Sequence, residues 1–115
     1  MNGMKYFSFI FFITGFVTAQ LVKPANGDTL NYIYVYFEWK QLAGSVSYQI
    51  QVAENDSAEF QDPLIDQVDS TLILIIEDGI EWNKTYFWRI RGIDDNNTYG
   101  TWRESWTFHT LPLQP

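Results

Sequence analysis

The side chains that could carry out chemistry are mainly carboxylates. The 115-residue chain has 14 acidic and 7 basic residues, and its formal net charge is −7 at pH 7. It has no cysteine and one histidine, His109, which excludes disulfides, thiolate zinc sites, cysteine nucleophiles and multi-histidine metal sites. A hydrolase that works with paired acids needs two carboxylates whose surroundings separate their pKa values. The acids here fall in turns and at outward strand positions, so we expect no enzyme, no metal and no cofactor.

Two short patterns could be taken for reactive sites. His109 alternates with the apolar Phe108, and no serine or cysteine stands at a spacing typical of a catalytic triad. Residues 94–97, Asp-Asp-Asn-Asn, offer oxygen ligands for calcium, but the downstream glutamate of an EF-hand loop is missing. We interpret His109 as a solvent-facing strand residue and residues 94–100 as a turn.

The charge also limits the partners. Binding to a phosphate backbone depends on Lys and Arg that displace counterions, so an acidic chain argues against nucleic acid. An anionic membrane surface is disfavoured for the same reason. We therefore expect a protein partner or a cell-surface polysaccharide.

The N-terminal segment differs from the rest of the chain. Lys5 precedes an apolar run over residues 6–17, which is too short to span a bilayer comfortably. The run ends in small residues up to Ala19, which is typical of a signal-peptide cleavage site. Residues 1–19 are therefore predicted to be a signal peptide cleaved before Gln20. An uncleaved membrane anchor is the alternative. The signal predicts a secreted or cell-surface protein without membrane insertion after cleavage, and the absence of cysteine makes a bacterial origin the better fit.

From residue 20 onward, apolar and polar residues alternate with a period of two, and turn residues interrupt them every eight to twelve positions. This pattern predicts an all-β domain over residues 20–110, followed by a linker-like tail at 111–115. Seven short strands in about 90 residues predict an immunoglobulin-like sandwich of two antiparallel sheets. We expect a first turn at residues 24–28, an edge strand at 65–68, and further strands at 32–40, 47–53, 71–76, 85–93 and 102–110.

Several spaced features together resemble the fibronectin type III family. They are Phe-Glu-Trp at 37–39, the alternating strand 48–53, the spacing of Ile80 and Tyr86, the strand 86–92 and the segment 102–110. The resemblance implies a seven-stranded sandwich and a tyrosine corner, in which the Tyr86 hydroxyl bonds back to the preceding chain. The expected structural residues are Trp39, Ile80, Tyr86, Trp88, Trp106 and Phe108.

The strand at 32–40 has an unusual outer face. If Val35, Phe37 and Trp39 are buried, period-two alternation places the neighbouring tyrosines outside. Strand 71–76 adds apolar residues to that side, whereas an outer sheet face is usually polar. Tyrosine is also simply common in strands. These tyrosines can therefore be ordinary strand residues with no binding role. The alternative is a contact surface formed by Tyr32, Tyr34, Tyr36, Ile73 and Ile75.

Cationic side chains mark another strand. Arg89 and Arg91 share the outward face of strand 85–93. Trp102 is expected either to cap the sandwich or to stack against an arginine.

These observations predict a secreted, non-catalytic fibronectin type III-like module for protein interaction, adhesion or spacing. An accessory carbohydrate-binding module of a secreted hydrolase system is the alternative. Another is the leading module of a longer surface protein, because the tail resembles a linker between neighbouring modules.

Overall fold

The computed structural model describes residues 20–54 and 60–114, so the predicted signal peptide at 1–19 lies outside the described residues. Within the described ranges no helix has the length and apolar character needed to cross a membrane. The fold is all-β, as predicted.

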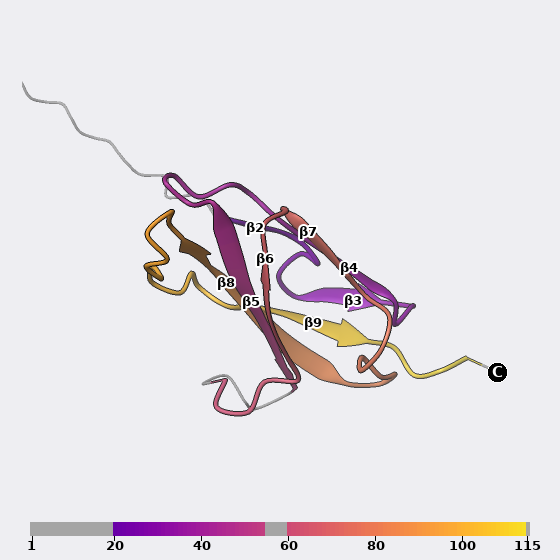
Figure 1. Ribbon diagram of the computed structural model, residues 1–115. Helices are drawn as coiled ribbons and strands as arrows, with labels where there is room; N and C mark the ends of the chain where they lie inside the picture. Colours follow the sequence, from indigo (N-terminus) through magenta and orange to yellow (C-terminus); the bar gives the residue numbers. More distant parts are fainter. Residues whose placement is uncertain (1–19, 55–59, 115) are drawn as a thin grey trace, which may run out of the picture.

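Two sheets lie face to face as layers (Figure 1). The three-stranded sheet has the order β2-β4-β7, and the five-stranded sheet has the order β3-β9-β8-β5-β6. The strands are β2 Leu21–Lys23, β3 Asp28–Leu30, β4 Val35–Trp39, β5 Ser47–Glu54, β6 Ile65–Asp69, β7 Ile73–Ile76, β8 Thr85–Ile93 and β9 Trp106–Thr110.

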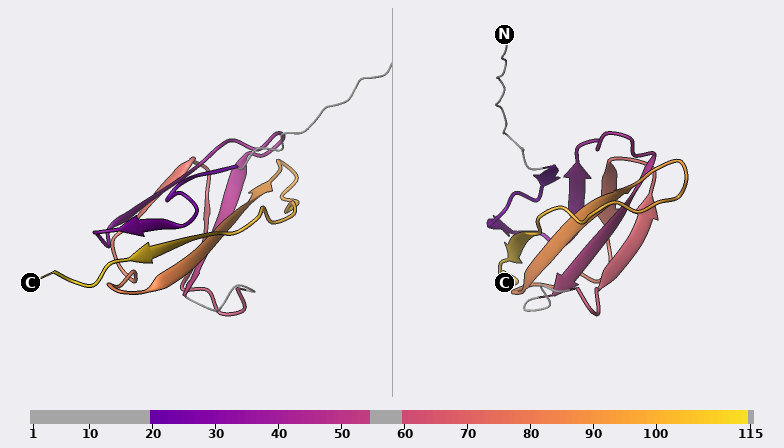
Figure 2. Two further views of the ribbon diagram at one scale, coloured as in Figure 1. Left: turned by 180° about the vertical axis from the view of Figure 1, so that it is seen from behind. Right: turned by 90° about the vertical axis from the view of Figure 1, so that its left-hand side faces the viewer.

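Eight strands are found in the described residues, where seven were predicted. β3 begins inside the predicted turn 24–28 and pairs in parallel with β9, Asp28 opposite Phe108. The chain leaves the three-stranded sheet after Lys23 and joins the five-stranded sheet here, a crossing visible at the indigo end of the ribbon (Figure 2). Three residues are too few for a period-two pattern to reveal a strand.

Other predicted bounds also need correction. β4 begins at Val35 and not at Tyr32, and β9 begins at Trp106 and not at Trp102. Before Trp106 the chain contacts β8 through isolated bonds: the Arg103 amide donates to the Ile90 carbonyl (2.9 Å) and the Gly100 amide to the Gly92 carbonyl (2.8 Å). β6 is an edge strand as predicted, at the end of the five-stranded sheet.

Aromatic rings join the two layers. Phe37 of the three-stranded sheet packs edge-on against Trp88 and Phe108 of the five-stranded sheet, with ring centroids 5.1 and 5.8 Å apart. Trp39 contacts Tyr48 in the same way at 6.0 Å. The indole N–H groups of Trp39 and Trp88 are buried without a hydrogen-bond partner among the described residues, so packing alone holds these rings.

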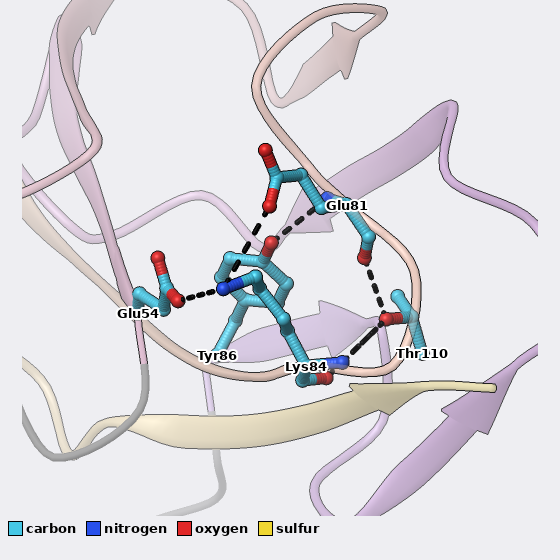
Figure 3. A network of polar contacts seen from close by, with 5 residues as sticks. All are labelled: Glu54, Glu81, Lys84, Tyr86 and Thr110. Atoms are coloured by element: carbon cyan, nitrogen blue, oxygen red, sulfur yellow. Dashed lines mark hydrogen bonds and ion pairs between the residues drawn. The ribbon is translucent and has the colours of Figure 1, made fainter. Parts of the chain in front are cut away.

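The tyrosine corner forms as the resemblance implied, and it sits in a larger polar network (Figure 3). The Tyr86 hydroxyl accepts a hydrogen bond from the Glu81 amide (2.8 Å). The Thr110 hydroxyl donates to the Glu81 carbonyl (2.7 Å) and accepts from the Lys84 amide (3.0 Å). The Lys84 ammonium pairs with Glu54 at 2.6 Å, which raises the pKa of Lys84. The network ties the β7–β8 connection to the end of β9.

Candidate contact surface

The backbone of β4 alternates between core and solvent. Val35, Phe37 and Trp39 are buried, which places the side chains of Tyr34 and Tyr36 on the opposite side of the sheet. Tyr34 is 65% exposed and Tyr36 is 38% exposed. This parity is the one predicted from the sequence.

The adjacent strand β7 continues this surface. Tyr36 stands opposite Ile75, and Glu38 stands opposite Ile73, in antiparallel register. Ile73 and Ile75 are 41% and 56% exposed. Opposed side chains of an antiparallel pair lie within contact distance. We call the surface formed by Tyr32, Tyr34, Tyr36, Ile73 and Ile75 the apolar face.

Tyr32 lies before β4, beside a hollow at the margin of the apolar face. The hollow has a volume of about 690 Å³ and is lined by Val22, Lys23, Pro24, Ala25, Asp28, Tyr32 and Tyr36. Tyr32 is 48% exposed. The ammonium of Lys23 lies 5.7 Å from the centroid of the Tyr36 ring. Lys23 and Asp28 were missed by the sequence prediction, because their approach depends on the crossing between the sheets.

The outer face of the five-stranded sheet is organised differently. The guanidinium of Arg89 lies between two rings, 4.2 Å from the centroid of Phe60 and 4.0 Å from that of Trp102. Arg91 lies between Trp102 (4.3 Å) and Tyr99 (4.7 Å). The stacking of Trp102 on arginine, one of two predicted roles, is thereby confirmed. We call Phe60, Arg89, Trp102, Arg91 and Tyr99 the ladder.

Polar side chains of β5 and β6 lock the ladder in place. Arg89 donates from Nε and one Nη to the Gln51 side-chain oxygen (3.0 and 2.7 Å), and Arg91 Nε donates to Gln49 (2.7 Å). Both glutamine side chains donate in turn to the carboxylate of Asp66 (2.7 and 3.0 Å).

Both Arg89 and Gln51 are withdrawn from water in this arrangement. Burial, with a smaller contribution from the neighbouring Arg91, lowers the pKa of Arg89. Gln51 is 7% exposed, although the alternation of strand 47–53 predicts that it points to water. Arg89, held against it by two hydrogen bonds, accounts for its burial.

The predicted structural residues fall mostly in the core. Trp39, Ile80, Tyr86, Trp88 and Phe108 are buried. Trp106 is only partly buried, packed edge-on against Trp88 with centroids 6.4 Å apart. Its place at the first residue of β9, where strand pairing begins, explains the difference.

The two patterns that could be taken for reactive sites have local roles. His109 is half-buried, and its Nδ1 lies 3.1 Å from the Thr85 hydroxyl, its register partner across β8 and β9. The Asp94 carboxylate accepts from the amides of Asn96 and Thr98, both at 2.9 Å, and so caps its own turn. Neither arrangement brings a nucleophile, a base and an oxyanion donor together.

No family model matches the chain, and no curated protein does. Solved structures do resemble it. An α-L-rhamnosidase from Dictyoglumus thermophilum aligns with a TM-score of 0.60 and 19% identity over 77% of this chain and 11% of that one. The α-L-rhamnosidase of Streptomyces avermitilis, complexed with L-rhamnose, aligns with a TM-score of 0.56 and 15% identity over 80% of this chain and 10% of that one. CopC from Methylosinus trichosporium OB3b aligns with a TM-score of 0.50 and 14% identity over 85% of this chain and 98% of that one.

The chain spans about a tenth of the length of each rhamnosidase. At these identities the likeness concerns the fold alone. It supports an all-β sandwich.

Proposed function

We propose that the protein is a secreted or cell-surface, non-catalytic binding module of fibronectin type III-like architecture. Its contact surface is the apolar face, and its partner is a protein or a polysaccharide outside the cell. The predicted signal peptide supports the location.

One observation carries this proposal. The apolar face presents five large side chains, each between 38% and 65% exposed, on adjacent segments. Isolated monomers rarely expose contiguous apolar patches of this kind, because keeping them in water is unfavourable. A partner that covers the face would remove that area from water.

An accessory carbohydrate-binding module is the second candidate. Two of the structural neighbours are rhamnosidases that contain this fold as a small part of a much longer chain. The exposed tyrosine rings beside the hollow supply flat apolar faces of the kind that fits a sugar ring.

Sedimentation and retention measurements test the proposal. The double variant Tyr34→Ser, Ile75→Ser removes the centre of the apolar face without touching the hollow. The matched control Val46→Ser, Val68→Ser removes two apolar side chains of 56% and 51% exposure elsewhere. Each protein is sedimented at low and high salt and incubated with insoluble polysaccharides.

We expect wild type and control to self-associate or to be retained equally, and the face variant to lose that behaviour. Since an acidic chain repels its own copies, any self-association should strengthen with salt. Identical behaviour of all three proteins would overturn the apolar face as the contact surface and would leave a spacer.

A further inference from the structure

The hollow at the margin of the apolar face lies where the chain passes from one sheet to the other. Lys23 is the last residue of β2, in the three-stranded sheet, and Asp28 is the first residue of β3, in the five-stranded sheet. Val22, Pro24 and Ala25 also line the hollow, and Tyr32 and Tyr36 contribute aromatic rings. Its volume of about 690 Å³ lies within the range of small-molecule sites.

Two charges of opposite sign enter the hollow. The Lys23 ammonium lies over the Tyr36 ring, within the distance at which a cation is attracted to an aromatic face. The Asp28 carboxylate accepts one hydrogen bond through Oδ1 from the Thr29 amide (2.9 Å). Both ion pairs that the described residues form belong to Lys84, so neither Lys23 nor Asp28 is tied to a counterion there. The hollow therefore offers a donor, an acceptor and two tyrosine side chains, with no net charge.

This composition selects among ligand classes. An anionic ligand would be repelled by Asp28 and by the net negative charge of the protein. A cationic ligand would be repelled by Lys23. A purely apolar side chain would strip water from both charges without replacing it. A neutral sugar satisfies all four groups, because its C–H face packs on aromatic rings while its hydroxyls both donate and accept.

We propose that this hollow binds one ring of a neutral sugar, stacked on Tyr32 and Tyr36 and hydrogen-bonded to Lys23 and Asp28. The proposal deepens the proposed function, on which it rests, by naming the chemistry of the partner at one end of the apolar face. The remainder of that face would cover the continuation of the glycan.

Amide NMR titration locates such a site directly. The protein expressed from the full 115-residue sequence is titrated with L-rhamnose, D-glucose, D-galactose and N-acetyl-D-glucosamine, and with D-glucuronate as the charged comparison. We expect at least one neutral sugar to shift the amides of residues 22, 23, 25–28, 32 and 36, with a dissociation constant of about 1 to 10 mM, as suits so few contacts.

Three variants assign the contacts. Tyr32→Leu and Asp28→Asn should each weaken the sugar about tenfold, since one removes a ring and the other replaces the acceptor by an amide that can still bond the Thr29 amide. Val46→Ala is the control, an exposed apolar side chain outside both the hollow and the apolar face, and should leave the affinity unchanged.

The outcomes separate the two proposals. If none of the four neutral sugars perturbs the hollow, or if glucuronate binds there more tightly, the sugar site is wrong. Loss of partner binding in the Tyr34→Ser, Ile75→Ser variant would in that case still uphold the apolar face. Sugar shifts at the hollow, together with unchanged partner binding in that face variant, would uphold the sugar site and overturn the wider contact surface.

Discussion

Both outer faces of this sandwich carry aromatic side chains, but those of one face are covered by arginines and those of the other are exposed. On the five-stranded sheet, Phe60, Trp102 and Tyr99 are covered by the guanidiniums of Arg89 and Arg91. On the three-stranded sheet, Tyr34 and the two isoleucines remain exposed, and within residues 20–54 and 60–114 only Lys23 is a cation close to a ring there, at the margin. An aromatic residue outside the core is therefore not by itself a sign of binding. What distinguishes a contact surface is the absence of an internal partner among the described residues.

The difference follows from local sequence. β8 places two arginines two residues apart on its outward side, and the segment after its turn brings Tyr99 and Trp102 back over them. At the equivalent outward positions β4 places Tyr36 and β7 places Ile73 and Ile75, and Tyr34 directly precedes β4. The ladder thus packs against an irregular segment, whereas the side chains of the apolar face remain exposed.

The largest expected effect is at the centre of the ladder. Trp102→Ala removes the ring that both guanidiniums share, so we expect the free energy of unfolding to fall by about 2 to 3 kcal/mol. Tyr34→Ala on the apolar face should change it by less than about 0.5 kcal/mol. Urea denaturation of both variants measures the contrast, and equal losses would contradict it.

A smaller loss is expected at the tyrosine corner. Tyr86→Phe leaves the Glu81 amide without its partner and should lower the free energy of unfolding by about 1 to 2 kcal/mol. Tyr34→Phe, the matched removal of an exposed hydroxyl, should change little. If urea denaturation gave equal values for the two, the roles assigned to the buried and exposed tyrosines would be wrong.

The outer step of the ladder should contribute less again. A double-mutant cycle of Arg91→Met and Tyr99→Leu keeps much of the side-chain volume and removes one stacking contact. We expect a coupling free energy of about 0.5 to 1 kcal/mol. A coupling free energy near zero in chemical denaturation would show that the contact between Arg91 and Tyr99 does not stabilise the fold.

The smallest effect is on the pH dependence. Burial raises the pKa of Tyr86 above its ordinary value of 10.0, and the ion pair with Glu54 raises that of Lys84 above 10.5. Folding therefore favours the protonated forms, a contribution present below pH 10 and lost as the pH rises through the folded pKa values. Thermal melts should show stability falling above about pH 10.

Tyr86→Phe is the control for this pH dependence. We expect the alkaline decline to be shallower in this variant than in wild type. An unchanged slope would mean that Tyr86 does not contribute to the decline.

Much of this architecture follows from the period-two pattern. Alternation around the buried Phe37 correctly placed Tyr34 and Tyr36 outside, and the apolar run of β7 supplied Ile75 beside them. The corner was expected from the resemblance to fibronectin type III domains, to which the spacing of Ile80 and Tyr86 contributes.

The parts that were missed depend on contacts between residues distant in sequence. β3 is too short to show a period and forms by pairing with the opposite end of the chain. Phe60 and Tyr99 lie outside the regular strands, and the chain path alone brings them to arginines of β8. Lys23 and Asp28 meet at the hollow only because the chain changes sheets between them.

Site-specific photocrosslinking tests the contrast between the two faces most directly. Benzoylphenylalanine, which inserts into C–H bonds of proteins and glycans alike, replaces Tyr34 on the apolar face or Val68 on β6. Val68 pairs with Gln49, on the ladder side, and is 51% exposed. Each protein is expressed in its native host and irradiated in place. We predict adducts, identified by mass spectrometry, from position 34 and none from position 68. Adducts of equal yield from both positions, or from position 68 alone, would contradict the assignment of the apolar face as the contact surface.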